Sequence, residues 1–234
     1  MAQVIFNRRL SQDFYLMRVA QPNEARMGQF CMLRAWDRYP LLSRPVSVFD
    51  ADPETLSFLY RTVGEGTRLL ARCREGDEVE TGRVQGNPFP LVSGKIALVG
   101  GGVGIAPLYL AAKTLKTRNP ATTVHLYLGF SGEPLLVEEY GAVGDRTTVK
   151  VGGFITDAVD PEHYDVILTC GPEAMMRALY NKCRASGTKL YVSLESRMAC
   201  GFGVCLACSC GTAEGQARKR ICTDGPVFLA EEVF

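Results

Sequence analysis

One stretch decides the fold of this 234-residue chain: Lys95-Ile96-Ala97-Leu98-Val99-Gly100-Gly101-Gly102-Val103-Gly104-Ile105-Ala106-Pro107. Its apolar first half predicts a short buried strand. Pro107 suits the first turn of a helix, because the N–H that proline lacks would have no partner there. The glycines in between let the backbone approach a ligand closely. A strand that passes through such a turn into a helix predicts a βαβ unit, and hence a parallel sheet.

The residues that follow continue this alternation. Apolar side chains recur on one helical face as far as Leu115, and Asn119-Pro120 ends that helix. A polar loop follows residue 130, and a second helix is expected over 173–186. Strands that alternate with helices predict an α/β domain with a parallel sheet. The expected strands are 123–130, 147–151, 164–169 and 189–194.

The first ninety or so residues have a different pattern. Short segments rich in β-branched and aromatic residues are separated by turn-forming runs such as Gln21-Pro22-Asn23 and Glu75-Gly76-Asp77. One short helix is expected over 66–73, with Leu69 and Leu70 facing inward. Many short strands at regular spacing predict a small β-barrel or sandwich. The expected strands are 14–20, 30–36, 45–49, 56–62 and 78–84.

The composition excludes several classes of protein. A chain with 47% hydrophobic and 22% charged residues is neither mainly disordered nor fibrous. A formal net charge of +1 argues against nucleic-acid binding, which normally needs a basic surface. The first residues show no apolar signal segment, and no apolar run is long enough for a membrane span. We therefore expect a cytoplasmic protein that binds neither nucleic acid nor membrane.

Cysteine is unevenly distributed along the chain. Nine cysteines are present, and five of them fall within the last 35 residues. From Glu195 onward the sequence is rich in glycine and short polar runs, with too little apolar material for a core of its own. The spacing Cys200-x4-Cys205-x2-Cys208-x13-Cys222 is that of plant-type ferredoxins, which hold a [2Fe–2S] cluster. Three thiolates on one tight loop, with a fourth from a separate segment, favour such a cluster here.

Zinc binding and disulfide bonding are the alternative roles for these cysteines. Structural zinc usually uses two Cys-x2-Cys pairs, and only one such pair is present. A disulfide framework does not suit a protein of the cytosol, where disulfides are rare. Cys210 is surplus to the ferredoxin pattern, and three further cysteines are expected to be packing residues: Cys31, Cys73 and Cys183.

Two turns of the α/β part are expected to face one crevice. The turn over 100–107 does not match G-x-G-x-x-G, but it lies between a strand and a helix, where a dinucleotide pyrophosphate binds. Cys170-Gly171-Pro172 follows a later strand, and ligands of open parallel sheets bind beyond the carboxyl ends of strands. A tight structural turn and a core thiol are the alternatives.

Two segments of the first part suit a flavin. Arg44-Pro45-Val46-Ser47 offers a guanidinium and a hydroxyl, which suit a pyrophosphate. Tyr60 offers a ring for stacking, and Gly66-Thr67 opens the expected helix, where amide donors are free. Each segment alone is consistent with ordinary surface structure. Together on one barrel they favour a flavin site.

The succession of R-P-x-S, G-G-x-G-x-A-P and C-G-P motifs resembles the ferredoxin reductase superfamily, in which an FAD barrel precedes a pyridine-nucleotide domain. The tail, from Glu195-Ser196-Arg197-Met198-Ala199-Cys200 to Cys222-Thr223-Asp224-Gly225-Pro226, is similar to that of the electron-transfer subunits of class 1B dihydroorotate dehydrogenases. The resemblance runs essentially from end to end. It implies FAD, a [2Fe–2S] cluster and NAD as cofactors, and as partner an FMN-containing catalytic subunit that oxidises dihydroorotate, in a heterotetramer with two copies of each chain.

The resemblance also assigns roles to residues. Cys170 would lie near the nicotinamide and help to orient it for hydride exchange with the flavin. FAD would be held by Arg44, Pro45, Val46, Ser47, Leu59, Tyr60, Arg61, Gly66 and Thr67. NAD would meet Gly101, Gly102, Val103, Gly104, Ile105, Gly171 and Pro172. The cluster ligands would be Cys200, Cys205, Cys208 and Cys222.

The expected architecture has three parts: an FAD-binding antiparallel β-barrel over 1–92, an NAD-binding α/β domain over 93–194, and a small [2Fe–2S] β domain over 195–234. NAD is favoured over NADP, because Phe130-Ser131-Gly132-Glu133 offers no cation for a 2′-phosphate after the second strand. No group of residues suited to deprotonating dihydroorotate is evident in the sequence. This fits an auxiliary subunit of a pyrimidine-biosynthetic oxidoreductase.

Two alternative functions remain open for the chain. The first is an FAD/[2Fe–2S] reductase of the same build that serves an oxygenase or a hydrogenase-type enzyme; the short tail and its Cys222-Thr223-Asp224-Gly225-Pro226 ending argue against it. The second is a zinc-stapled binding or regulatory module without catalysis. Flavin and cluster absorption would separate either redox protein from the zinc module.

Overall fold

The first part of the chain folds into a closed antiparallel barrel, in a computed structural model that describes residues 1–215 and 217–234. The strand order around the barrel is β1-β2-β5-β4-β3-β6. One short helix, α1 (Glu65–Leu70), follows β5 and seals the barrel with Leu70. The strands are β1 (Ala2–Arg9), β2 (Phe14–Ala20), β3 (Phe30–Arg34), β4 (Arg44–Asp52), β5 (Thr55–Arg61) and β6 (Glu78–Thr81).

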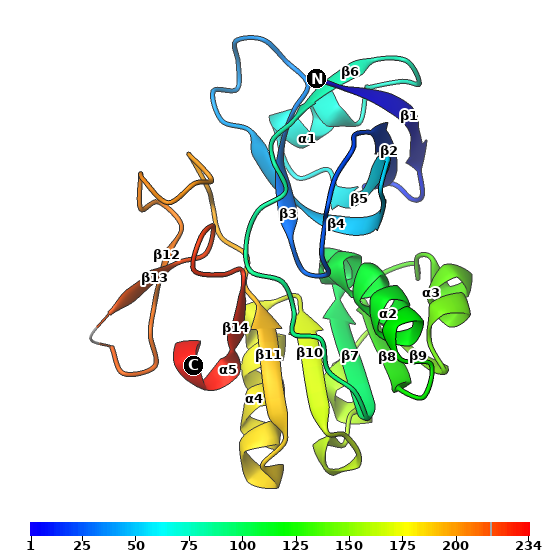
Figure 1. Cartoon of the computed structure of the whole chain (residues 1–234), viewed down its shortest axis with the longest axis vertical. Helices are drawn as coiled ribbons and strands as arrows, with labels where there is room; N and C mark the ends of the chain where they lie inside the picture. The colour runs from blue at the N-terminus through cyan, green and yellow to red at the C-terminus, as the bar shows by residue number, and fades with distance from the viewer. Residues whose placement is uncertain (216) are drawn as a thin grey trace.

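The second part is a six-stranded sheet with the order β14-β11-β10-β7-β8-β9. All of its pairs are parallel except β14 with β11. Helices α2 (Ala106–Arg118) and α4 (Glu173–Ser186) cover opposite faces of the sheet (Figure 1). The strands are β7 (Lys95–Gly101), β8 (Thr123–Phe130), β9 (Arg146–Val151), β10 (Val166–Cys170), β11 (Lys189–Ser193) and β14 (Val227–Leu229). Three short 3₁₀ helices complete this part: η1 (Gly102–Ile105), η2 (Ile155–Ala158) and η3 (Pro161–His163).

Aromatic side chains join the barrel to the sheet domain. Phe49 of β4 stacks on Tyr109 of α2, with 4.4 Å between the ring centroids, and both rings meet Tyr140 edge-on. Tyr140 is fully buried, and its hydroxyl donates a hydrogen bond to the carbonyl oxygen of Ile105 at 2.7 Å. The contact therefore fixes the glycine-rich turn relative to the barrel.

The tail is anchored at both ends and projects between them. A two-stranded hairpin, β12 (Ser209–Gly211) and β13 (Arg218–Arg220), stands apart from the main sheet (Figure 1). After it, β14 adds to β11, and the chain ends in α5 (Ala230–Val233). Gln216 lies outside the described residues. The last residues thus belong to the nucleotide-binding sheet, while the cysteine-rich loop lies beside the barrel.

The barrel and the parallel sheet confirm the predicted fold class. The prediction of a polar loop after residue 130 was incomplete, because helix α3 (Val137–Val143) lies there. That helix buries only Tyr140, so its sequence lacks the apolar stripe from which a helix is predicted. The first strand, β1, was also missing from the predicted strands. Among the described residues, no helix has both the length and the apolar character needed to cross a membrane.

Candidate functional site

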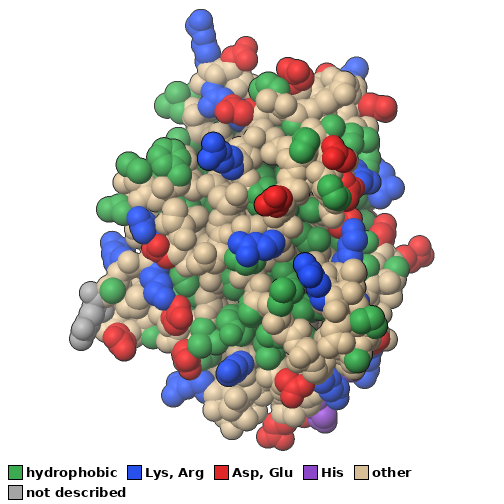
Figure 2. All heavy atoms as spheres, in the orientation of Figure 1, with side chains coloured by type: hydrophobic (Ala, Val, Ile, Leu, Met, Phe, Trp, Pro, Cys, Tyr) green, Lys and Arg blue, Asp and Glu red, His purple; other side chains and the backbone are tan. Residues whose placement is uncertain are grey.

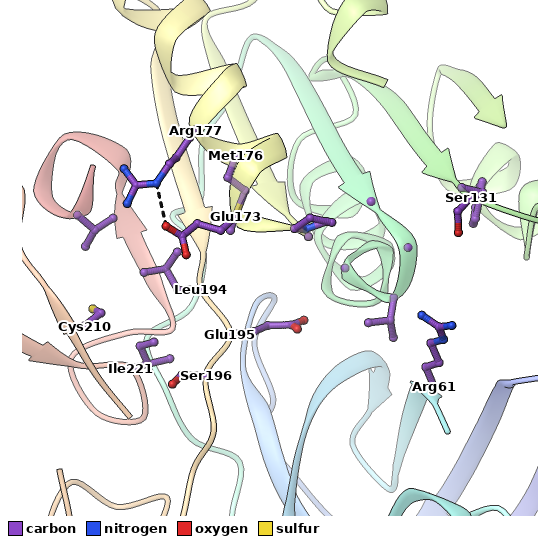
Figure 3. A pocket seen from close by; sticks show the side chains of 18 of the residues that line it. Arg61, Ser131, Glu173, Met176, Arg177, Leu194, Glu195, Ser196, Cys210 and Ile221 are labelled. Atoms are coloured by element: carbon purple, nitrogen blue, oxygen red, sulfur yellow. Dashed lines mark hydrogen bonds and ion pairs between the residues drawn. The ribbon is translucent and has the colours of Figure 1, made fainter. Parts of the chain in front are cut away.

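A crevice of about 1030 Å³ lies where all three parts of the chain meet. Phe14 and Arg61 line it from the barrel, the glycine-rich turn lines it from the carboxyl edge of the sheet, and Cys210 lines it from the tail (Figure 3). This position agrees with the rule that open parallel sheets bind ligands beyond the carboxyl ends of their strands. The volume is slightly above the usual range of about 300–1,000 Å³ for ligand pockets, which leaves room for a dinucleotide.

The two predicted turns face this same crevice, as expected. Gly101, Gly102, Val103 and Gly104 line it next to Gly171 and Pro172, and the two turns pack against each other. A Cβ atom on Gly104 would lie 2.5 Å from the Cys170 carbonyl oxygen and from the Gly171 Cα, so only glycine fits there. Ile105 is fully buried and belongs to the core beneath the turn, so its side chain does not line the crevice.

Cys170 ends β10 at the base of the crevice and is fully buried. Its sulfur lies 4.0 Å from Oε1 of Glu195, and burial raises the pKa of the thiol well above its ordinary value. Cys170 is thus a neutral thiol that backs the crevice wall.

Glu195 is a site residue that the sequence reasoning missed. It follows the end of β11, and its side chain projects into the crevice (Figure 3). The side chain reaches water in the crevice. The surrounding protein nevertheless removes part of the water from the carboxylate, and this desolvation raises its pKa above the ordinary value. A carboxylate directly after a parallel strand was the available signal, since β10 and β11 end side by side at Cys170 and Ser193.

A cradle on the barrel collects the residues predicted to bind pyrophosphate. A Cβ on Gly66 would lie 2.6 Å from Nε of Arg44 and 2.8 Å from the indole of Trp36. Trp36, the only tryptophan in the chain, also has the Arg34 guanidinium 5.7 Å from its ring centroid. Two guanidinium groups beside an indole suit an anionic ligand that carries a flat ring. The sequence reasoning did not single out Trp36.

The other predicted flavin residues occupy three kinds of position. Val46 and Leu59 point into the barrel core, and Pro45 and Ser47 lie half-buried on its outer face. Arg61 is exposed and lines the crevice. Side-chain contact with a ligand is therefore open to Arg44, Pro45, Ser47 and Arg61, whereas Val46 and Leu59 offer only their backbone.

Two side chains predicted to bind the flavin have partners within the protein in this structure. Tyr60 is only 2% exposed, and its hydroxyl donates a hydrogen bond to Asn7 at 3.0 Å, so its ring is not free to stack on a flavin. The Thr67 hydroxyl caps its own helix by accepting from the N–H of Val63 and Gly64. Five consecutive residues of β5, Leu56 to Tyr60, are buried, and Thr67 caps its helix, so only the backbone groups of Tyr60 and Thr67 remain for a ligand.

The tail brings its predicted ligands together as two pairs of thiols. The Cys205 N–H donates a hydrogen bond to the Cys200 sulfur at 3.5 Å, and Cys208 lies close enough to Cys222 to help raise the pKa of its thiol. Backbone N–H groups of Cys205 and Phe202 point at the Cys200 sulfur and, with that of Val204 and the Cys205 thiol, lower its pKa to about 6. Burial raises the pKa of Cys222 to about 11. One sulfur of the set is therefore poised as thiolate, the form that ligates metals.

The described residues hold no ready-made group of three or more metal-ligating side chains. Two adjacent thiol pairs nevertheless match a centre with two irons, each of which takes two cysteines. Cys210 lies on β12, lines the crevice and takes part in neither pair. Cys31 and Cys183 are buried in the core, as expected of packing residues, and Cys73 packs half-buried against it.

Comparison with known proteins accounts for this combination of sites. Residues 195–234 match the family described as the iron-sulfur cluster binding domain of dihydroorotate dehydrogenase B. A relative from Clostridium acetobutylicum, the electron transfer subunit of dihydroorotate dehydrogenase B (NAD+), is 41% identical over 99% of this chain and 96% of its own length. This chain belongs to the dihydroorotate dehydrogenase B electron transfer subunits. A second such subunit, from Caldanaerobacter subterraneus subsp. tengcongensis, is 38% identical over 100% of this chain and 97% of its own length.

Solved structures agree with the architecture of this electron transfer subunit. A chain of the NADH-dependent reduced ferredoxin-NADP oxidoreductase superposes with a TM-score of 0.90 and 30% identity, covering 100% of this chain and 90% of that one. The ferredoxin NADP+ reductase from Neisseria gonorrhoeae superposes with a TM-score of 0.68 at 18% identity, covering 84% of this chain and 93% of that one. The second likeness concerns the fold alone.

Proposed function

We propose that this chain is the electron-transfer subunit of an NAD-dependent dihydroorotate dehydrogenase, carrying electrons from a catalytic subunit through a [2Fe–2S] cluster and FAD to NAD+. The observation that carries the proposal is how the cysteine loop connects to the flavin cradle. Met32 of β3 pairs with Pro45 of β4, and a Cβ on Gly201 would lie 2.9 Å from the Met32 side chain. The cysteine loop is therefore held one strand away from the flavin cradle.

Residues of the barrel would hold FAD. Arg44 supplies the cation for the diphosphate, and Gly66 leaves the space in which the guanidinium and Trp36 come together. Ser47 and Pro45 face outward from β4, on the side where β3 meets the cysteine loop. FAD, when bound, exchanges two electrons with a nicotinamide and single electrons with a cluster, which makes it the converter between the other two groups.

The crevice would hold NAD against the barrel. Gly101–Gly104 present backbone N–H groups at the start of α2, where a pyrophosphate is favoured. Glu195 lines the part of the crevice where a nicotinamide would lie and could accept a hydrogen bond from its carboxamide, with the buried Cys170 thiol behind it. Glu133 also lines the crevice and supports NAD over NADP, because a carboxylate repels a 2′-phosphate.

Cys200, Cys205, Cys208 and Cys222 would hold the cluster. The Cys205 N–H donates a hydrogen bond to the Cys200 sulfur, the amides of Phe202 and Val204 also lower the pKa of Cys200, and the Gly203 amide acts in the same direction on Cys222. Such hydrogen bonds favour the thiolate form and tune the potential of a cluster. Cys205 is exposed, so the loop presents one side of the site to the exterior.

The partner would be an FMN-containing catalytic subunit, in a cytoplasmic heterotetramer with two copies of each chain. Relatives that carry the name electron transfer subunit support a partner of this kind. The exposed cysteine loop supports its location, because an electron carrier at the surface must come close to the cofactor that it serves. We expect the loop to lie in the interface between the subunits.

A reductase that serves a different partner is the second candidate. The chain of the NADH-dependent reduced ferredoxin-NADP oxidoreductase, 30% identical here, shows that the same build occurs in another assembly. The dihydroorotate dehydrogenase relatives are more similar, at 38–41% identity. The choice of partner therefore distinguishes the two functions.

The test is to co-express the chain with the dihydroorotate dehydrogenase catalytic subunit of the same organism and to purify by a tag on this chain. We expect the two proteins to co-purify, with flavin bands and a broader cluster shoulder in the visible spectrum, one FAD per chain and two irons per chain. A colourless protein with one zinc would contradict the redox function. A coloured protein that does not bind the dehydrogenase would favour the second candidate.

A further inference from the structure

Six large hydrophobic side chains are exposed in two loops on one side of the molecule. Three lie in the loop between β3 and β4: Tyr39 is 69% exposed, Leu41 76% and Leu42 46%. The other three lie in the loop between Cys200 and Cys208: Phe202, Val204 and Leu206, each at least 60% exposed. Figure 1 places both loops on the left, and Figure 2 shows hydrophobic side chains gathered along that upper left edge.

The loop between β3 and β4 is held rigid from beneath, although its apolar side chains face outward. Arg34 donates hydrogen bonds to the carbonyl oxygens of Trp36 and Leu41, both at 2.8 Å, and to that of Asp37. The Trp36 indole N–H bonds to the Pro40 carbonyl oxygen. The backbone is thus fixed, while the side chains of Tyr39 and Leu41 stay exposed in the part of the chain that the structure describes. A fixed loop with uncovered apolar side chains is typical of a recognition surface.

One strand carries both loops. Met32 and Arg34 lie two residues apart on β3, so their side chains leave the same face of the strand about 7 Å apart. Gly201 of the cysteine loop packs on Met32, and Arg34 clasps the loop over 37–41. The two exposed apolar sets are therefore neighbours on a common base, and they form one surface rather than two.

We propose that Tyr39, Leu41 and Leu42 of the FAD barrel form, together with the cysteine loop, a single docking surface for the catalytic subunit. This rests on the proposed function, which places only the cysteine loop at the interface; the new element is that the barrel itself docks. The occupant is the catalytic subunit, because the cysteine loop must face the protein with which it exchanges electrons. Since both loops present exposed hydrophobic side chains, the facing surface of that subunit should be an apolar recess.

Docking at this loop would reach the flavin cradle directly. Trp36 and Arg44 are bonded to the inner side of the same loop, through the carbonyl oxygens of Pro40 and Leu42. A partner that covers Tyr39 and Leu41 therefore also restricts the two side chains that contact Gly66. Binding of the partner at this surface would therefore also make the side chains of the FAD site more ordered.

The test compares Leu41→Asp with Leu91→Asp in the complete complex. Leu91 is a matched control because it is also a leucine in a loop, 65% exposed, and lies in the linker rather than on this surface. We expect Leu41→Asp to weaken binding of the catalytic subunit by about tenfold or more, as for a residue at the centre of an interface. NADH-dependent reduction of a dye and the cluster spectrum should keep their wild-type values in both variants.

A measurement on the wild-type protein makes the test independent of folding. Amide hydrogen exchange over 37–43 and over 201–206 should slow together when the catalytic subunit binds. Binding by Leu41→Asp within twofold of wild type, or protection of 201–206 alone, would overturn the inference. If the wild-type chain did not bind the dehydrogenase at all, the proposed function would fail as well, and that outcome is distinct from loss of binding in Leu41→Asp alone.

Discussion

At the scale of single residues, the tail has five cysteines, and we expect four of them to ligate the cluster but not Cys210. Replacing Cys205 by Ser should abolish the visible absorption of the cluster and loosen the tail, because a serine oxygen is a poor substitute for a soft thiolate and metal binding there also supplies folding energy. Replacing Cys210 by Ser is the matched control, since Cys210 belongs to neither thiol pair. Full cluster absorption in Cys205→Ser would disprove its assignment as a ligand.

Asp52 provides a pH dependence that is separate from the cofactors. The Thr55 hydroxyl and the Glu54 N–H, with help from Arg18, lower its pKa from 3.8 to about 2. The ionised group therefore adds stability above pH 4, and that contribution disappears as the pH falls through about 2. We expect Asp52→Asn to lower the thermal midpoint at pH 6 and the difference from wild type to shrink at pH 3. A difference that stays constant between these pH values would contradict this.

At the scale of elements, the turn between β7 and α2 is the least tolerant part of the sheet domain. Gly104→Ala should destabilise the protein by about 1–3 kcal/mol, as overpacking does, because the new methyl group would collide with the backbone at Cys170 and Gly171. It should also weaken NADH binding, measured by titration. Gly141→Ala in α3 is the control: it has open space and should stabilise the helix by up to about 1 kcal/mol. Equal effects of the two substitutions would contradict the role of the turn.

The elements also show what the sequence can and cannot predict. Strands β2 and β8 and helix α4 were predicted with their observed bounds, since strong periodicity and clear stop signals define them. Helix α3 was missed because it buries a single side chain. The pairing of β14 with β11 depends on contacts between distant segments, which periodicity does not encode. The position of Trp36 became evident only when folding placed it beside Arg44 and Gly66, whereas Glu195 carried the signal of a carboxylate that follows a parallel strand.

At the scale of the whole molecule, the barrel, the crevice and the cysteine loop form one connected path. The loop packs on β3, β3 pairs with β4, and the barrel borders the crevice. We expect the complex with the catalytic subunit to contain two copies of each chain, which native mass spectrometry measures directly. A stable complex with any other stoichiometry would contradict the heterotetramer while leaving the path within this chain intact.

The most direct test of the path is electron flow from one end to the other. The purified complex, supplied with dihydroorotate and NAD+, should form NADH, followed by its absorbance. The Cys205→Ser complex should not form NADH from dihydroorotate, although it should still reduce a dye with NADH, because that reaction needs only the crevice and the FAD cradle. Unchanged NADH formation by Cys205→Ser, or none by the wild-type complex, would contradict the claim that electrons pass through this chain in that order.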